Sequence, residues 1–265
     1  MKSAPAPQTS TASGIWRETP SSGDRRPYPP ARYGAAARAF NALRRTGIAL
    51  LLALALIPTG AFGQEEGGSG SAADSASPQE IRILAFGASI TQGYGLPPGE
   101  GLTVKLQEAL TARGYAVEVV NAGVSGDTTA GGLARLDWTL GEHFDIALLI
   151  LGSNDGLRGL DPADTRANLD AMLTKFEAKN IPVLLVGMYA PRNLGADYVA
   201  EFDPIYPALA EQHDVAGFMP FLLEGVALDP ALNQPDGIHP NEAGVAVMVD
   251  NMLPYLLPML PAAAE

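Results

Sequence analysis

Short apolar runs of strand length alternate with helical patterns along this chain, and this alternation constrains the fold more than any other feature. Apolar runs occupy residues 81–86, 116–120, 145–151 and 181–187, and the last two are nearly continuous in apolar residues. Such runs suit strands that are covered on both faces. A weaker fifth run lies at 215–219.

The segments between the runs carry the periodicity of amphipathic helices. Apolar residues recur at intervals of three and four over 102–110 and again over 169–176. Asp161 and Pro162 precede the second of these patterns, as an acidic N-cap followed by proline at the first helical position. Strands and helices in alternation predict an α/β fold, a parallel sheet with helices on both faces.

Two further segments follow the fourth strand. The apolar pattern of residues 197–212 is interrupted by Pro204 and Pro207, so its structure stays undecided. A final helix is expected to begin near residue 240. In a sheet of this kind the functional loops gather beyond the carboxyl ends of the strands.

The segment that precedes the first strand has the features of an export signal. Arg44 and Arg45 precede the apolar run GIALLLALALIP, and Ala61 and Gly63 follow at the spacing that a signal peptidase recognises. The run is shorter than the roughly 20 residues that a bilayer-spanning helix needs. We therefore expect a cleaved signal peptide, a protein resident in the periplasm or secreted, and no stable membrane anchor.

The expected domain organisation follows from these observations. Residues 1–63 form the N-terminal extension with its signal peptide, and 64–80 form a flexible linker of glycine, serine and alanine. The folded domain is expected over 81–258, followed by a C-terminal tail over 259–265.

Charge and cysteine content exclude several classes of function. Residues 1–46 carry eight basic and two acidic residues, which leaves nine basic and 27 acidic residues in the rest of the chain. A body this acidic argues against nucleic acid or an anionic membrane as a partner. The chain has no cysteine, so disulfides, thiolate nucleophiles and Cys-ligated zinc are excluded.

Three serines are present from Ile81 onward, and each lies just after an expected strand: Ser89, Ser125 and Ser153. The loops that hold them read GASIT, NAGVSGDT and LGSNDG. Residues of this kind dominate any tight turn, but the rule for parallel sheets also places all three loops at one edge. We therefore expect a functional site at that edge.

Asp236 and His239 lie three residues apart in the turn QPDGIHPN. At that spacing the carboxylate can accept a hydrogen bond from one imidazole nitrogen while the other nitrogen faces a substrate. A serine hydroxyl becomes an effective nucleophile when such a base removes its proton, so we expect a catalytic triad of Ser89, His239 and Asp236. His143 and His213 each precede a strand and are expected to be ordinary surface residues.

A tetrahedral adduct on the serine carries a negative oxygen that needs fixed hydrogen-bond donors. The expected donors of this oxyanion hole are the backbone N–H groups of Ser89 and Gly126 and the side-chain amide of Asn154. Each has a simpler explanation, because Gly126 also suits a turn with positive φ and Asn154 also suits a helix cap.

The same stretches resemble the SGNH, or GDSL-type, hydrolases, whose four blocks supply serine, glycine, asparagine and histidine. The matching blocks are GASIT with Ser89, SGD with Gly126, GSND with Asn154, and DGIHPN with Asp236 and His239. The resemblance extends from about residue 81 to 257. VVNAGVSGDTTAGGLARL and NDGLRGL make it most specific for the bacterial secreted arylesterases and thioesterase/lysophospholipases.

This resemblance implies a three-layer α/β/α sandwich of the flavodoxin-like type with a five-stranded parallel sheet. It also implies no cofactor and no metal, and hydrolysis of small-molecule esters or thioesters through an acyl-serine intermediate. One position departs from the family, because the residue before the serine is usually aspartate and here is Ala88. The missing carboxylate is not the triad acid, so the departure bears on the shape of the first loop.

The stretch GMYAPRNLGADY, after the fourth strand, resembles the mobile substrate loop of the thioesterase subgroup. A plain connection made of turn residues would explain the same composition. The resemblance implies an acyl site bordered by Met188, Tyr189, Ala190, Pro191, Arg192, Asn193, Leu194 and Gly195.

Three other functions fit parts of the pattern. A carbohydrate O-acetyl esterase would use the same triad in a shallow polar pocket. A binding protein without catalysis would be consistent with Ala88. A metal-assisted phosphoesterase would use Asp127, Asp155, Asp236 and His239.

Overall fold

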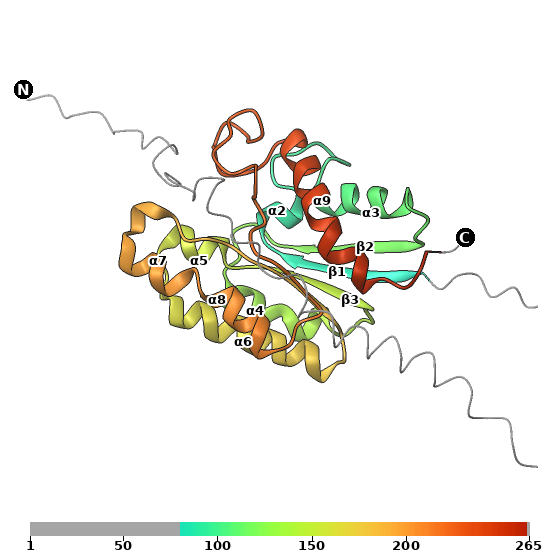
Figure 1. The fold of residues 1–265 in the computed structure, drawn as a ribbon, viewed down its shortest axis with the longest axis horizontal. Helices are drawn as coiled ribbons and strands as arrows, with labels where there is room; N and C mark the ends of the chain where they lie inside the picture. Colours follow the sequence, from blue (N-terminus) through green and yellow to red (C-terminus); the bar gives the residue numbers. More distant parts are fainter. Residues whose placement is uncertain (1–79, 264–265) are drawn as a thin grey trace, which may run out of the picture.

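A computed structural model describes residues 80–263, in which a five-stranded parallel sheet lies between two layers of helices (Figure 1). The order of the strands is β2-β1-β3-β4-β5, which is the flavodoxin-like order. The expected α/β/α sandwich is thus confirmed. The strands are β1 (Ile81–Gly87), β2 (Val117–Gly123), β3 (Ile146–Ile150), β4 (Val183–Val186) and β5 (Gly217–Met219).

The helices form the two outer layers of the sandwich (Figure 1). One layer holds α3 (Leu102–Thr111) and α9 (Glu242–Leu256), which continues into the short η3 (Leu257–Met259). The other layer holds α4 (Thr129–Thr139), α6 (Pro162–Ala178) and α8 (Ile205–Gln212). Shorter helical segments lie in the connections: α2 (Ser89–Gln92), α5 (Ser153–Arg158), η2 (Arg192–Leu194) and α7 (Ala196–Phe202).

The core lies on both faces of the central strands. Every residue of β3 and β4 is buried, which is the physical reason why these two runs are almost continuous in apolar residues. At the start of α6 the Asp161 side chain accepts a hydrogen bond from the N–H of Ala163, and Pro162 occupies the first turn, as the sequence predicts.

The region that the sequence left undecided forms two helices, α7 and α8, which meet at Asp203 and Pro204. Pro207 lies in the first turn of α8. The N–H that proline lacks would have no partner within the helix at that position, so Pro207 is tolerated there.

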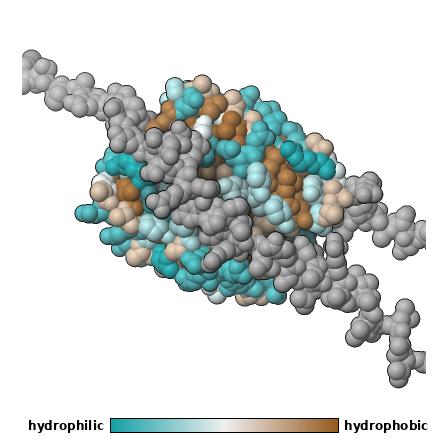
Figure 2. Space-filling view, in the orientation of Figure 1, coloured by the Kyte–Doolittle hydropathy of each residue, from teal (hydrophilic) through white to brown (hydrophobic). Residues whose placement is uncertain are grey.

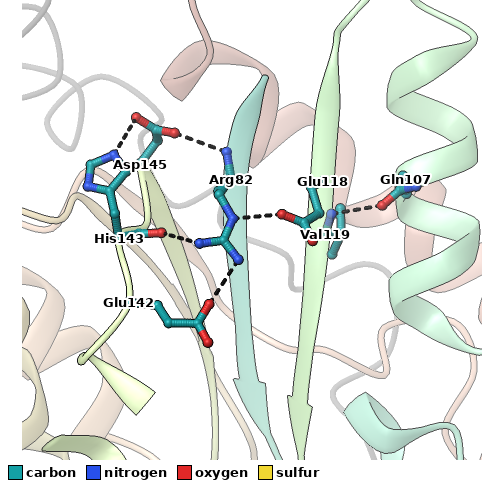
Figure 3. Close-up of polar contacts among 7 residues, drawn as sticks. All are labelled: Arg82, Gln107, Glu118, Val119, Glu142, His143 and Asp145. Carbon is teal, nitrogen blue, oxygen red and sulfur yellow. Dashed lines mark hydrogen bonds and ion pairs between the residues drawn. The ribbon is translucent and has the colours of Figure 1, made fainter. Parts of the chain in front are cut away.

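At the amino ends of the strands, Arg82 joins β1 to its neighbours (Figure 3). Its guanidinium donates to Glu118 on β2 at 2.6 Å, to Glu142 at 3.0 Å and to the backbone carbonyl of His143 at 2.9 Å. The two carboxylates raise the pKa of Arg82. These contacts fix the end of the sheet that lies away from the serine-bearing loops.

The edge strand β2 is covered by a side chain from α3. The Gln107 side chain accepts a hydrogen bond of 2.8 Å from the N–H of Val119 (Figure 3). An unpaired N–H on an edge strand offers a site for pairing with another chain, and this contact occupies one such group.

Hydrophilic residues cover much of the face seen in Figure 2, and apolar residues gather along α9. Within residues 80–263, no helix is both long and apolar enough to cross a bilayer. The expected signal peptide lies outside the described residues, as does the expected linker except for Glu80.

Candidate active site

Ser89 is the first residue of α2, the single helical turn that directly follows β1. The turn is closed by the N–H of Gln92, which donates to the carbonyl of Ala88 at 2.9 Å, and by the N–H of Gly93, which donates to the carbonyl of Ser89 at 3.0 Å. Because the first N–H groups of a helix have no partner within it, the backbone of Ser89 presents a donor at the carboxyl edge of the sheet.

The turn before α9 brings an imidazole and a carboxylate to this serine. His239 Nε2 lies 2.8 Å from Ser89 Oγ, and His239 Nδ1 lies 2.7 Å from Asp236 Oδ2. The second oxygen of Asp236 accepts hydrogen bonds from the N–H groups of Ile238 and His239 at 2.9 and 3.0 Å. The three residues assigned to a triad from the sequence therefore form one continuous chain of hydrogen bonds.

The environment of Asp236 favours its ionised form. Partial burial raises the pKa of this carboxyl, but the hydrogen bonds from the backbone and ring of His239 and from the N–H of Ile238 outweigh burial, and the net pKa is lowered. An ionised Asp236 accepts a hydrogen bond from Nδ1–H, which makes Nε2 the ring nitrogen that can take the hydroxyl proton of Ser89.

The loops that follow β1, β2 and β3 contact one another. The hydroxyl of Ser125 donates to the side chain of Gln92, which joins the first loop to the second. Asn154 Nδ2 donates to the carbonyl of Asp127 at 2.8 Å, which joins the second loop to the third. The amide of Asn154 carries a second hydrogen, which this contact leaves for a ligand.

Gly126 lies in the second loop with φ of 82°, a value that favours glycine. Its carbonyl accepts a hydrogen bond of 2.8 Å from Arg158. Gly126 and Asn154 thus come from adjacent loops at the edge that holds Ser89. Asn154 does not cap α5, since Gly152 occupies the N-cap position.

Arg135, on α4, contacts the second loop and the end of β1. The sequence did not identify it as a residue of the site. Its Nε donates to Asp127 at 2.7 Å, and its guanidinium also donates to the carbonyl of Gly87 at 2.9 Å. The guanidinium carbon lies 4.0 Å from the centre of the Phe86 ring. Arg135 therefore joins the end of β1 to the second loop. The only signal in the sequence was its place in the stretch GGLARL, which carries the family resemblance.

Asp155 is 2% exposed and has a structural role beside Asn154. Its carboxylate accepts hydrogen bonds from the N–H of Thr129 at 2.9 Å and from the hydroxyl of Thr129 at 2.5 Å. The hydroxyl of Thr165 also lies 3.4 Å from it. Asp155 thus joins α5 to the first turns of α4 and α6.

The arrangement gives no support to a metal-assisted phosphoesterase. Asp127 pairs with Arg135, while Asp155 is engaged by Thr129, so these carboxylates serve different protein partners. Over residues 80–263, no group of three or more histidine, aspartate or glutamate side chains is arranged to hold a metal ion.

The expected substrate loop is only partly accessible. Met188 and Ala190 are 3% and 0% exposed, and Pro191 is also buried, so these three residues hold the loop to the core and do not border an open site. This corrects the expectation that the whole stretch lines an acyl site.

The half-buried residues of the loop, Tyr189 and Arg192, each contact another part of the protein. Tyr189 packs against Phe221, with ring centres 4.7 Å apart, and Arg192 pairs with Asp203 at 2.7 Å. The exposed part of the loop is Asn193, Leu194 and Gly195.

The remaining histidines lie away from the site, and one differs from expectation. The side chain of His143 is 69% exposed, as the sequence predicts. The side chain of His213 is 8% exposed and lies between Asp170, at 2.8 Å, and Glu177, at 2.7 Å. The prediction of an ordinary surface residue was therefore wrong for His213. Both partners lie on α6, and the spacing of residues along the sequence does not show that His213 packs against this helix.

Comparison with known proteins identifies the family of this chain. The family model described as the GDSL-like lipase/acylhydrolase family matches residues 85–247. The chain belongs to this family. It is a serine hydrolase that acts on ester bonds, and the resemblance inferred from the four sequence blocks is confirmed.

Members of the GDSL-like family include close relatives of this chain. The esterase TesA of Pseudomonas aeruginosa is 43% identical over 179 residues, which cover 67% of this chain and 89% of that protein. The arylesterase of Vibrio mimicus is 40% identical over 166 residues, which cover 62% of this chain and 82% of that protein. The crystal structure of AlinE4, an SGNH-hydrolase family esterase, is 46% identical with a TM-score of 0.59, and the match covers 71% of this chain and all of that one.

This hydrolase departs from the GDSL pattern at Ala88, which is 4% exposed. The carbonyl of Ala88 closes the turn that presents Ser89. That turn therefore forms through the backbone of Ala88, without a carboxylate at this position.

Proposed function

We propose that this hydrolase cleaves carboxylic esters or thioesters through an acyl-serine intermediate. The observation that carries the proposal is the chain of two short contacts, 2.8 Å from Ser89 to His239 and 2.7 Å from His239 to Asp236. A hydroxyl joined to a base, which is in turn oriented by a carboxylate, is the arrangement of an activated nucleophile.

In the proposed reaction, Ser89 Oγ bonds to the carbonyl carbon of the substrate and its proton passes to His239 Nε2. The resulting oxyanion accepts hydrogen bonds from the N–H groups of Ser89 and Gly126 and from the amide of Asn154. The protonated imidazole then donates its proton to the leaving alcohol or thiol as the bond to the carbonyl carbon breaks. Water adds to the acyl-serine with the same histidine as base, which releases the acid and restores the hydroxyl.

We propose aryl esters and acyl thioesters as the substrate class, and the arylesterase name of one relative supports the aryl esters. The exposed residues Asn193 and Leu194 would border the acyl group. Leu160, which is 39% exposed, belongs to the same border, because Leu194 lies beside the neighbouring Gly159. A carbohydrate O-acetyl esterase on the same triad would hydrolyse acetyl esters and lose rate steeply as the acyl chain lengthens.

Labelling with a serine-directed phosphonate tests the proposal. We expect loss of esterase activity to parallel incorporation of one phosphonyl group, recovered by peptide mass spectrometry on Ser89. Ser89→Ala should neither react nor turn over substrate, while His143→Ala should behave as the wild type. Esterase activity retained in folded Ser89→Ala would refute the proposed nucleophile and would exclude the acyl-serine mechanism.

We also propose that the protein is exported and resides in the periplasm or is secreted, because the run after Arg45 has the pattern of a signal peptide. The expected mature protein begins near Gln64. Sequencing of the N-terminus of protein recovered from the cell envelope and the medium checks this, and an uncleaved chain confined to the cytoplasm would contradict it.

A further inference from the structure

Gln234 joins the loop that carries the serine to the loop that carries the histidine. Its side-chain Nε2 donates to the carbonyl of Tyr94 at 2.8 Å and to the carbonyl of Pro240 at 3.0 Å. The first acceptor lies 140 positions away, five residues after Ser89, and the second directly follows His239. Both hydrogens of one amide are thus used to connect the two halves of the site.

The same residue also closes the turn that presents the imidazole. The N–H of Gln234 donates to the carbonyl of His239 at 2.7 Å, and the carbonyl of Gln234 accepts from the N–H of Gly237 at 2.9 Å. The neighbouring residues Asn233 and Pro240 form a short antiparallel bridge. The backbone of Gln234 is therefore fixed to the turn that carries His239. The side chain of Gln234 extends from this turn to the loop that carries Ser89.

Tyr94 connects Gln234 to the backbone of Ser89. Its N–H donates to the carbonyl of Ser89 at 3.0 Å. Its ring lies against the imidazole of His239, with ring centres 4.8 Å apart, although Tyr94 is 52% exposed. The hydrogen bond from Gln234 to the carbonyl of Tyr94 therefore restrains the turn that begins at Ser89. It also restrains the Tyr94 ring that packs on His239.

The serine loop is shaped to admit the glutamine. A Cβ atom at Gly95 would lie 2.1 Å from Gln234 Oε1, so a larger residue here would force the amide to shift from its place between the two loops. Gly95 also has φ of 72°, which favours glycine. The paired donors and the space beside Gly95 thus meet at one contact.

We infer that Gln234 is a positioning residue that sets the separation of Ser89 Oγ and His239 Nε2. The inference rests on the proposed function, since it concerns the efficiency of the same triad. Gln234 acts through the two backbones it joins and takes no proton in the reaction. A displacement of about 1 Å between reacting groups can cost on the order of 100-fold in rate, so loss of this connection should appear in kcat.

Two substitutions test the inference with a short aryl ester as substrate. Gln234→Ala removes both donors, and we expect kcat to fall about 10- to 100-fold while KM stays within about twofold. The rate of phosphonate labelling of Ser89 should fall by the same factor, because labelling needs the same serine and histidine but no later step.

Gln234→Glu keeps the size of the side chain and supplies a readout that a purely structural role would not produce. An ionised carboxylate faces two carbonyl oxygens and donates to neither, whereas a protonated one donates to one of them. The ratio of the variant kcat to the wild-type kcat should therefore rise as the pH falls, while the same ratio for Gln234→Ala stays flat.

Gln212→Glu is the matched control. The Gln212 amide donates to Asp170 at 2.5 Å, on the α6–α8 side of the molecule and away from the triad. Its oxygen accepts a hydrogen bond from Arg166 at 2.8 Å. This variant should leave kcat unchanged. The inference is overturned if folded Gln234→Ala and Gln234→Glu both retain wild-type kcat, or if the ratio for Gln234→Glu does not change with pH. A wild type that is inactive on every ester tested, and so no more active than Ser89→Ala, would instead overturn the proposed function.

Discussion

Ser89 and His239 lie 150 positions apart in the chain, yet their side chains are 2.8 Å apart. The contact between His239 and Asp236, in contrast, is local, because it spans three residues of one turn. At the scale of single residues the site therefore combines one pair that the turn itself can build and one pair that needs the whole sheet.

Asp236→Asn tests the local pair. An amide at this position can donate to Nδ1, which would place the ring proton on Nε2 and prevent that atom from accepting the serine proton. We expect kcat for an aryl ester to fall by roughly 1,000- to 10,000-fold, as in other triads that lose the orienting carboxylate. Steady-state kinetics measures the loss, and circular dichroism checks that the variant folds; wild-type turnover would show that another group orients His239.

At the scale of secondary-structure elements, the polar contacts of Asp155 and His213 join helices of the layer that holds α4, α6 and α8. Asp155 joins α5 to α4 and α6, and His213 joins α8 to α6. Neither residue takes part in the proposed reaction, so substitutions at these positions should affect the stability of the fold more than kcat.

Asp155→Ala leaves the N–H and the hydroxyl of Thr129 buried without their acceptor. We expect the free energy of unfolding to fall by about 3 kcal/mol, because hydrogen bonds to a charged group are lost and buried donors stay unpaired. Denaturant titration measures this change. Asp137→Ala removes a carboxylate whose side chain is 75% exposed and pairs with Lys175, so it should cost no more than about 0.5 kcal/mol.

His213 makes the stability dependent on pH. Burial lowers the pKa of this imidazole, but hydrogen bonds to Asp170 and Glu177 outweigh burial and raise the net pKa above 6.5. A raised pKa in the folded state stabilises the fold fully below the unfolded value, and the contribution is lost as the pH rises through the folded value.

His213→Ala should therefore destabilise the protein more at pH 5.5 than at pH 9. The pH-dependent part should be up to about 1 kcal/mol, since solvent screens the two exposed carboxylates. Thermal unfolding of both proteins across this range gives the difference, and a larger difference at alkaline pH would contradict the assignment of the ion pairs.

At the scale of the whole molecule, the acidic surface bears on which substrates approach the site. The chain carries 29 acidic and 17 basic residues, and eight of the basic ones lie within residues 1–46. A body of this charge repels anionic substrates at long range, and salt screens that repulsion.

We expect the KM of an acyl-CoA thioester, which carries several phosphate charges, to fall several-fold between about 20 mM and 0.5 M salt. The KM of an uncharged aryl ester should stay nearly constant over the same range. Steady-state assays of the two substrates side by side measure the effect, and an acyl-CoA KM that rises with salt would indicate local cationic recognition instead.

Much of the fold was predictable because its signals are local. The expected strands at 145–151 and 181–187 became Ile146–Ile150 and Val183–Val186, since burial on both faces forces an apolar run. Helix α4 was missed because Gly131 and Gly132 weaken a helical pattern. A Cβ atom at Gly132 would lie 2.3 Å from the Leu151 side chain, so the glycine permits close packing that no local pattern reports.

By itself, the sequence determined the alternation of strands and helices, the edge at which the loops gather, and the short Asp236–His239 pair. Periodicity and turn residues report how each segment is buried and where it ends, and these are local properties. Only the tertiary structure decided that Gln234 contacts Tyr94, that Arg135 supports the second loop and that Met188 faces the core. Each of those contacts joins residues that are far apart in the sequence or depends on how distant elements pack. The spacing of side chains along the chain does not show which distant elements will meet.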